Sequence, residues 1–379
     1  MDSTFTASEN GRAWAEIDLK ALSYNTSELR AHLKPGCELM AVVKANAYGL
    51  GAGMVADRLS GDGVKAFAVA TVSEGVELRK HGIEGEILVL GYTRPEDSKF
   101  LSDFHLAQLA VDGGYAKALD ETGNKIVVHV AVDTGMHRLG IEARNVREIE
   151  SVFECRNLTV AGVATHLASS DSIRDTDMEA TNRQIEKFRA TVSALKSSGY
   201  DVGKLHIQAS YGVINYPDLQ YDYARVGIAL YGVKSHNGET ATSPALRPVL
   251  SLRAVIAQVR WIDAGETVSY GGAFKAAAPV KLATVCIGYA DGIPRQMSGN
   301  GGQCIVQGRL VPIVGRICMD LLMVDVTGIE SVRPGDIATL IGADGNAEIR
   351  CEDFAEVSGT ITNDILCRIG SRLPRIYIE

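Results

Sequence analysis

The sequence is poor in aromatic residues, has no excess of positive charge and contains no long apolar segment. Aromatic residues make up 6% of the 379 residues, and 38 Lys and Arg stand against 46 Asp and Glu, which gives a net charge of −8. A general nucleic-acid-binding protein would carry a basic surface, so this class is excluded. No apolar run reaches about 18 residues, the length needed to cross a membrane, so we expect no membrane span in this chain.

Paired cysteines and a leader segment are also missing. The seven cysteines are odd in number, and no two have the Cys-X-X-Cys spacing. This pattern excludes a disulfide framework and a zinc site, and it indicates reduced thiols in a cytoplasmic protein. The first 14 residues are polar and acidic, without the apolar core of a signal peptide. A segment cut from a larger membrane protein would have the same features.

Short apolar runs alternate with amphipathic stretches through the first two thirds of the chain. They are rich in Val, Ile and Ala, as strands buried on both faces are. Eight such runs with helical stretches between them predict an eight-stranded β/α barrel, with a doubly wound open sheet as the alternative. The runs span residues 39–44, 67–72, 86–91, 106–111, 125–133, 158–166, 204–210 and 223–228.

The pattern changes near residue 245. Closely spaced β-type segments separated by Gly and Asp follow, which predicts a second, mainly β domain. A final stretch, 351–370, has a helical pattern. We therefore predict a barrel over residues 13–245 and a β-rich domain over residues 246–379.

The segment AVVKANAYGLG (41–51) places a lysine at the end of the first predicted barrel strand. Small residues and glycines flank Lys44, and Tyr48 follows four positions later, which leaves room for a planar cofactor near the backbone. A lysine desolvated in such a pocket has a lowered pKa and can form a Schiff base with an aldehyde. The alternative for a lone lysine at this position is a strand end that points to solvent.

This segment resembles the pyridoxal-phosphate lysine motif of the alanine racemase family. The resemblance continues in order through both predicted domains, which makes it specific. The matching segments are AWAEIDLKAL near the start, VDTGMHRLG (132–140), ATHLASSD (164–171), YARVGIALYG (223–232), VSYGG (268–272), GYADG (288–292), VGRICMD (314–320) and LCRIGSRLPR (366–375). The family's fold is a β/α barrel plus a β domain, which agrees with the pattern of the apolar runs.

The resemblance implies a two-base racemase. Lys44 would hold pyridoxal 5′-phosphate and act as the base for the α-proton of the D-enantiomer, and Tyr270 would act on the L-enantiomer. A tyrosine with an ordinary pKa near 10 is a poor base, so its phenolate needs a donor or a positive charge nearby. His166, tied to Arg225, is the candidate, and Arg225 would face the pyridine nitrogen. Without the resemblance, a strand-end histidine or a surface salt bridge would explain these two residues.

The other binding roles also follow from the resemblance. Tyr48, Ser210 and the backbone amides of Gly227 and Ile228 would hold the cofactor phosphate, after the first, seventh and eighth strands. Barrels often bind phosphate at the loops that follow strands seven and eight. Arg138 would orient the cofactor and the substrate carboxylate.

The β domain would complete the site of a neighbouring subunit. In the family, the tyrosine base comes from the partner, together with a Met amide for the carboxylate and a Tyr at the entrance. Here these residues would be Tyr270, Met319 and Tyr289. The resemblance therefore implies a homodimer with two shared sites.

Three positions depart from the family pattern. Ala131 stands where many members have a lysine, often carbamylated, and Leu50 stands where a His is usual. Asn363 replaces a tyrosine that narrows the substrate pocket in the family. A small amide opens volume and adds a donor and an acceptor, so it suits a substrate one hydroxyl larger than alanine. In having Asn at this position, the chain resembles serine racemases of the vancomycin-resistance type. The alternative explanation for Asn363 is neutral drift at a helix residue.

Two other functions compete with racemisation of alanine and serine. One is a different pyridoxal-phosphate reaction on the same fold, such as a decarboxylase or an aldolase. The other is a non-catalytic protein that binds the cofactor and needs Lys44 but no second base. Arg225 and Tyr270 argue against the first, and exchange of the substrate α-proton in variants of Lys44 and Tyr270 would separate the second from a racemase.

Overall fold

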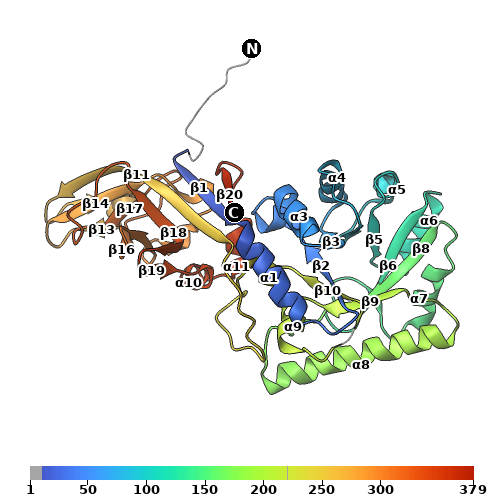
Figure 1. Ribbon diagram of the computed structural model, residues 1–379. Helices are drawn as coiled ribbons and strands as arrows, with labels where there is room; N and C mark the ends of the chain where they lie inside the picture. The colour runs from blue at the N-terminus through green and yellow to red at the C-terminus, as the bar shows by residue number, and fades with distance from the viewer. Residues whose placement is uncertain (1–10, 220) are drawn as a thin grey trace, which may run out of the picture.

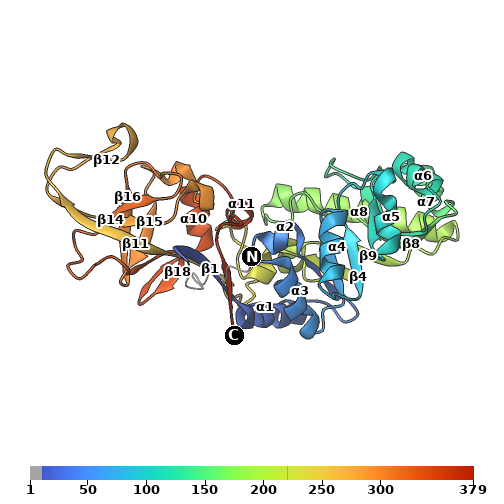
Figure 2. The same cartoon turned by 90° about the horizontal axis from the view of Figure 1, so that it is seen from above.

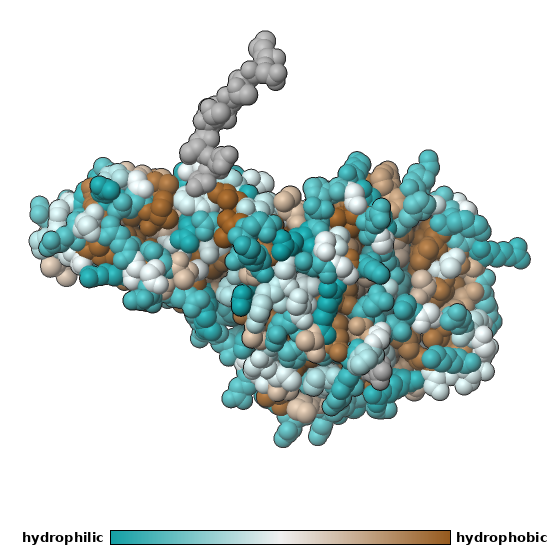
Figure 3. All heavy atoms as spheres, viewed as in Figure 1, coloured by the Kyte–Doolittle hydropathy of each residue, from teal (hydrophilic) through white to brown (hydrophobic). Residues whose placement is uncertain are grey.

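The computed structural model describes residues 11–219 and 221–379. They form two units side by side, a barrel wrapped by helices and a smaller unit built mainly of strands (Figure 1). The N-terminal and C-terminal strands lie between the two units, and the view from above shows a narrow junction there (Figure 2). Hydrophilic side chains cover most of the face seen in Figure 3, with apolar residues between them on both units.

The barrel closes through eight parallel strands. Neighbouring strands pair in chain order, and β5 pairs with β6 to complete the ring. The closure confirms the predicted barrel and excludes the open sheet, in which two strands would have free edges. Each predicted apolar run overlaps one of these strands. They are β2 (Glu38–Val42), β3 (Ala66–Val69), β4 (Glu86–Val89), β5 (Ala107–Ala110), β6 (Ile126–Asp133), β8 (Leu158–Ala164), β9 (Lys204–Gln208) and β10 (Tyr223–Val226).

Helices cover the outside of the barrel. The longest, α8 (Asp175–Ser197), buries Ile185, Phe188 and Val192 on one face, as its helical spacing predicts. The side chain of Thr71 caps α4 and accepts a hydrogen bond from the amide of Glu74. The other helices are α1 (Leu19–Ala31), α2 (Lys44–Tyr48), α3 (Ala52–Gly61), α4 (Val72–Lys80), α5 (Ser98–Asp103), α6 (Gly113–Glu121), α7 (Val146–Phe153) and α9 (Ser210–Asn215). No helix in the described part of the chain is both long and apolar enough to span a membrane.

The second unit is a mostly antiparallel sheet, which confirms the predicted β-rich C-terminal part. Its strands after the barrel are β11 (Leu250–Ile262), β14 (Val280–Val285), β15 (Gln303–Val306), β16 (Arg309–Val314), β17 (Leu322–Asp325), β18 (Ile337–Asp344), β19 (Ala347–Ile349) and β20 (Arg375–Ile378). A short hairpin, β12 (Thr267–Val268) and β13 (Phe274–Lys275), extends from its far end.

The first strand joins this second sheet and not the barrel. β1 (Ala13–Asp18) pairs antiparallel with β11 and parallel with β20. Sequence analysis grouped residues from 13 onward with the barrel because they precede it along the chain. The pairing partners of β1 lie more than two hundred residues later, so local pattern alone does not place it.

Two short helices near the C-terminus return the chain to the barrel. They are α10 (Cys351–Val357) and α11 (Thr362–Cys367), within the stretch predicted to be helical. α11 packs closely on the turn after β2, where a Cβ on Gly49 would lie 2.4 Å from the Leu366 carbonyl oxygen. This contact places one face of α11 at the open end of the barrel.

Candidate active site

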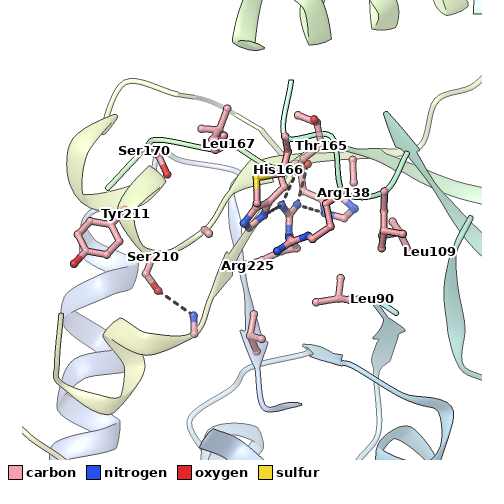
Figure 4. A pocket seen from close by; sticks show the side chains of 18 of the residues that line it. Leu90, Leu109, Arg138, Thr165, His166, Leu167, Ser170, Ser210, Tyr211 and Arg225 are labelled. Atoms are coloured by element: carbon pink, nitrogen blue, oxygen red, sulfur yellow. Dashed lines mark hydrogen bonds between the residues drawn. The ribbon is translucent and has the colours of Figure 1, made fainter. Parts of the chain in front are cut away.

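A cavity of about 490 Å³ opens at the carboxyl ends of the barrel strands. In barrels of this kind, this is the end at which active sites form. Figure 4 shows Arg138, His166 and Arg225 gathered on one side of the cavity and Ser210 on another. Nine of the twelve predicted site residues line it. They are Lys44, Tyr48, Arg138, His166, Ser210, Arg225, Gly227, Ile228 and Asn363.

Lys44 enters the cavity from a left-handed turn. The four residues after it, Ala45 to Tyr48, have φ between 52° and 54°. This conformation costs about 1–2 kcal/mol per residue for L-amino acids, so other contacts must hold it. The Ala45 amide donates to the Glu74 carboxylate at 2.7 Å, and the Ala52 amide donates to the Asn46 side chain at 2.8 Å. Burial and then the charge of Arg138 lower the pKa of Lys44, which favours its neutral, nucleophilic amine.

Arg225, on β10, is buried, and its hydrogen-bond partners among the described residues are all neutral. Its guanidinium lies 2.6 Å from His206 Nδ1 and donates to the backbone oxygens of His206 at 2.9 Å and Thr165 at 2.7 Å. Burial, followed by the charge of Arg138, lowers the pKa of Arg225 to about 10. Arg225 therefore stays charged at neutral pH and presents a fixed donor group to the cavity.

His166 follows the carboxyl end of β8 and is held by Arg225. One guanidinium nitrogen of Arg225 lies 3.3 Å from His166 Nδ1. Because an arginine can only donate, this Nδ1 must accept, and the proton of the neutral ring lies on Nε2. Burial and then Arg225 lower the pKa of His166 to about 3, so the ring is neutral at physiological pH. His166 is thus a neutral imidazole whose remaining N–H is free to donate.

A cradle suited to an anion lies at the other side of the cavity. The Ser210 hydroxyl accepts hydrogen bonds from the amides of Gly227 at 3.1 Å and Ala229 at 3.3 Å. A Cβ at Gly227 would lie 2.5 Å from the phenolic oxygen of Tyr48, so only glycine leaves this space open. Hydroxyls and backbone amides at one point favour a phosphate group. The residues present therefore fit the phosphate end of pyridoxal phosphate.

The three positions that depart from the family pattern have different surroundings. Asn363, on α11, lines the cavity, and its Oδ1 is buried without a hydrogen-bond partner among the described residues. Ala131 is buried in the cavity wall and brings no charge to Arg138, which is exposed at the rim. Leu50 is fully buried in the main hydrophobic core. Asn363 is thus the departure that leaves an unused polar atom at the site.

The three predicted residues from the second unit lie outside this cavity. Tyr270, Tyr289 and Met319 are 69%, 42% and 53% exposed. Tyr270 begins the turn between β12 and β13, at the end of the second unit that is remote from the barrel (Figure 2). Within one chain these three residues therefore do not meet Lys44.

Hydrogen bonds connect the three loops that carry these residues. The amides of Tyr289 and Ala290 donate to the carbonyl oxygens of Cys318 and Met319, each at 3.0 Å. The Ser269 hydroxyl, next to Tyr270, donates to the Arg316 carbonyl oxygen at 2.7 Å. We call Tyr270, Tyr289 and Met319 the exposed trio, because they form one exposed part of the second unit.

Sequence analysis missed several residues of the cavity wall. Asp133 accepts hydrogen bonds from the amides of Gly135, Met136 and His137 and so shapes the turn that carries Arg138. His206 holds Arg225, as described above. Asp133 lies in the VDTGMHRLG segment, and His206 interrupts an apolar strand, so both carried a signal.

Comparisons with known proteins agree along the whole chain. The family described as "Alanine racemase, N-terminal domain" matches residues 17–235, and "Alanine racemase, C-terminal domain" matches residues 249–377. An "Amino-acid racemase" of Enterococcus faecalis is 43% identical over 366 residues, and a "Serine/alanine racemase" of Enterococcus gallinarum is 39% identical over 363 residues. Each match covers 96% of this chain and 51% of the relative, so the chain spans about half the length of these relatives.

Full-length relatives and solved structures show the same similarity. An "Alanine racemase" of Carboxydothermus hydrogenoformans is 38% identical over 371 residues, which cover 96% of this chain and 99% of the relative. The crystal structure of alanine racemase from E. faecalis has a TM-score of 0.89 at 30% identity, with 100% of both chains covered. The alanine racemase of Bartonella henselae with covalently bound pyridoxal phosphate has a TM-score of 0.85 at 31% identity, and covers 97% of this chain and 100% of that one.

Proposed function

The chain belongs to the alanine racemase family, and from this premise we propose that it interconverts the L and D enantiomers of alanine and serine with pyridoxal 5′-phosphate as cofactor. The observation that carries the proposal is the single barrel cavity that holds Lys44, Arg225 and the cradle of Ser210 and Gly227. The relatives named above support racemisation of an amino acid, and the name of one of them includes serine.

Several residues of the barrel would hold the cofactor. When bound, pyridoxal phosphate supplies an electron sink for the negative charge left on the substrate α-carbon. Lys44 is the attachment residue, because its lowered pKa favours the neutral amine. Ser210, Tyr48 and the amides of Gly227 and Ile228 would bind the phosphate. Arg225 would face the ring nitrogen, where a donor that cannot accept a proton leaves this nitrogen neutral.

Two bases on opposite faces of the α-carbon would move the proton. Lys44 acts on the D-enantiomer, and Tyr270 of a second copy acts on the L-enantiomer. His166 would donate its Nε2–H to the phenolate of this tyrosine, since Arg225 occupies Nδ1. A hydrogen bond to the charged form lowers the pKa of a tyrosine, which makes it a better base near neutral pH.

A homodimer would complete each site. The hairpin that carries Tyr270 lies at the end of the second unit remote from the barrel (Figure 2), and none of the exposed trio lines the cavity of its own chain. Head-to-tail contact between two copies, closed by two-fold symmetry, would bring each trio to the other copy's barrel. Met319 would then offer its backbone amide to the substrate carboxylate beside Arg138, and Tyr289 would line the entrance.

Asn363 supports serine as a second substrate. Its buried Oδ1 has no hydrogen-bond partner among the described residues, although such acceptors are normally satisfied. The hydroxyl of serine is a donor that alanine lacks, and it would satisfy this acceptor. A site that hydrogen-bonds a substrate hydroxyl discriminates more strongly than an apolar pocket does.

Exchange of the α-proton in D₂O tests the two-base proposal. For L-Ala and L-Ser, we expect Tyr270→Phe to slow exchange by about a hundredfold or more, because a general base is lost. Exchange that starts from the D-enantiomers requires only Lys44 and should persist in Tyr270→Phe. Lys44→Ala should abolish both exchanges together with the visible absorbance of the bound cofactor.

The exposed Tyr92 and Lys117 lie outside the cavity and provide matched controls as Tyr92→Phe and Lys117→Ala. Both variants should exchange at the wild-type rate. A wild-type protein that takes up no pyridoxal phosphate, or that exchanges no α-proton, would overturn the proposed function.

A further inference from the structure

A line of buried polar side chains crosses the interior of the barrel, which in this fold is normally filled by branched apolar residues. Arg225 stands at the end nearest the active-site cavity (Figure 4). Behind it lie His206 on β9 and His129 on β6, both with no exposed surface. Glu86, the first residue of β4, ends the line, with a side chain that is 25% exposed.

The contacts along this line determine which nitrogen of each imidazole carries the proton. Arg225 lies 2.6 Å from His206 Nδ1, His206 Nε2 lies 2.8 Å from His129 Nδ1, and His129 Nε2 lies 3.1 Å from Glu86 Oε1. Arg225 can only donate, so His206 carries its proton on Nε2 and donates it to His129. His129 then carries its own proton on Nε2, which faces the carboxylate. The last contact is electrostatic, because it is not aligned as a hydrogen bond.

The strand next to His129 makes room for its ring. Gly162 on β8 pairs with His129, and the register shifts just before this pair. A Cβ at Gly162 would lie 2.4 Å from the Lys204 carbonyl oxygen on β9 and 2.5 Å from His129 Nδ1. Any other residue would therefore collide both with the neighbouring strand and with the ring of His129. The missing side chain leaves the ring the space in which it contacts His206.

The charges at the two ends explain the line. Arg225 is a buried cation whose described hydrogen-bond partners are all neutral imidazoles or carbonyl oxygens. A buried charge without a counter-charge is strongly disfavoured. Glu86 carries a carboxylate at the other end of the line, where two imidazoles separate it from Arg225. Hydrogen-bond chains in a low-dielectric interior polarise one another, so this charge reaches Arg225 through them.

We propose that Glu86 is the counter-charge of Arg225 and that Glu86, His129 and His206 are positioning residues that hold the orientation of Arg225 from the opposite end of the barrel. The part of this inference that concerns racemisation rests on the proposed function. The charge line itself does not depend on it, because all four residues belong to this chain and are in contact without the cofactor.

Glu86→Gln tests the proposal, because it removes the charge and keeps the shape of the side chain. Tyr223→Phe is the matched control, since the Tyr223 hydroxyl donates to the other oxygen of Glu86 at 3.1 Å but touches neither imidazole nitrogen. The first readout is the ¹⁵N spectrum of the histidine rings, which reports the tautomer. In the wild type we expect His129 and His206 to be neutral with the proton on Nε2.

Glu86→Gln should move the ring signals of both histidines, and Tyr223→Phe should leave those of His206 unchanged. If Glu86→Gln yields no folded protein, His129→Gln keeps a donor and an acceptor at that position and should also move the His206 signals. His206 signals that stay the same in the variant that folds would overturn the proposal.

The pH dependence of unfolding is the second readout. Burial alone would raise the pKa of Glu86, but His129, Tyr223 and Lys204 outweigh it, and the pKa is lowered. Glu38 and Asp222 face Tyr223 from the same end of the barrel. A carboxyl group with a lowered pKa stabilises the fold above its unfolded pKa of about 4.3, and this stability is lost as pH falls through the folded value.

The unfolding midpoint of Glu86→Gln should therefore lie below that of the wild type near neutral pH, and the difference should shrink in acid, as the pH falls below about 4.3 and through the lowered pKa of Glu86 in the folded protein. A difference that is the same near neutral pH and in acid would mean that Glu86 acts only through packing and would contradict the proposal.

Turnover of the loaded enzyme is the third readout. Glu86→Gln should lower kcat by about tenfold with little change in KM, the lower end of what outer-shell partners contribute at metal-bound histidines. Tyr223→Phe should stay near the wild type. If the wild type does not racemise amino acids, the proposed function fails, yet the histidine spectra and the unfolding curves still decide the charge line. Unchanged spectra in an active racemase would overturn the charge line alone.

Discussion

The barrel and the β-rich unit each carry predicted site residues, but only those of the barrel meet within one chain. Nine of them line a single cavity, because closure of the eight strands brings their carboxyl ends together. The exposed trio lies on loops of the other unit, and none of its three residues lines that cavity. One chain therefore carries all the predicted site residues but does not bring them together in one cavity.

The same contrast appears in the surroundings of the side chains. Arg225 is buried and held by several hydrogen-bond contacts, one of which joins it to His166. Burial, followed by the charge of a neighbouring arginine, lowers the pKa of both groups. Tyr270 and Met319 are more than half exposed. Large apolar side chains that gather on a surface mark a contact with another molecule. The barrel half is therefore organised within one chain, whereas in the proposed dimer the other half would be completed by the partner.

Mixing two inactive variants is the strongest test of whether each active site is built from the barrel of one chain and the exposed trio of another. Lys44→Ala and Tyr270→Phe should each lose about a hundredfold or more of the racemase activity. After joint unfolding and refolding, half of the dimers would be mixed, and each of these would hold one intact site. We therefore expect recovery of about a quarter of the wild-type activity per chain.

Two samples serve as controls for the mixing experiment. Each variant carried through the same refolding alone should stay inactive, and wild type mixed with wild type should recover fully. If each site were built from a single chain, the mixture would remain as inactive as its components, and the shared site would be refuted.

Gly227→Ala tests the cradle on the barrel side of the comparison. The new Cβ would lie 2.5 Å from the Tyr48 hydroxyl, and overpacking of this kind costs about 1–3 kcal/mol. We expect the affinity for pyridoxal phosphate to fall by about tenfold to a hundredfold, measured by titration of the cofactor-free protein. Gly61→Ala is the control, because no atom lies within 4 Å of a Cβ there. Equal affinity in both variants would mean that the phosphate binds elsewhere.

Much of the barrel cavity and of the set of residues that line it could be predicted from the sequence. The eight apolar runs predicted the eight strands, and the residues directly after them line the cavity, because parallel strands of a barrel all end on the same side. Lys44 was predicted in this way, whereas His166 and Arg225 were predicted from the resemblance to the alanine racemase family. Their contacts were not, since the distance between Arg225 and His166 depends on strand register, which one sequence does not fix.

Three features needed the structure for physical reasons. The pairing of β1 with β11 and β20 joins segments that are far apart in sequence, so no local pattern reveals it. His129 and His206 each interrupt an apolar strand, but their contact depends on the tilt of the strands across the barrel. The exposure of Tyr270 depends on the direction of a hairpin at the far end of the sheet.

The titration of His166 tests whether the barrel cavity keeps water away from this side chain. Its pKa of about 3 in the folded protein lies below the unfolded value of about 6.5. Between these two pH values the imidazole is protonated in the unfolded chain but neutral in the folded chain. The free energy of unfolding therefore falls as the pH drops below about 6.5. Relative to His166→Asn, the wild type should lose up to about 1.4 kcal/mol of unfolding free energy per pH unit between about pH 6 and 4.

Chemical denaturation at several pH values measures this difference. The other histidines are the same in both proteins, so their contributions cancel in the comparison. A difference between wild type and His166→Asn that does not change with pH would mean that water reaches His166 and that the barrel side is as open as the exposed trio.

Asn363→Tyr is expected to have the smallest effect and concerns substrate choice alone. The ring would fill the space beside Lys44 and remove the unpaired Oδ1, so serine would lose both room and a hydrogen-bond partner. We expect the ratio of L-Ser to L-Ala turnover to fall several-fold, which corresponds to about 1 kcal/mol of lost discrimination. Asn300→Tyr, on an exposed turn of the second unit, should leave the ratio unchanged. A ratio that stays constant in Asn363→Tyr, or moves toward serine, would show that the barrel wall does not select the substrate and that the exposed trio must do so.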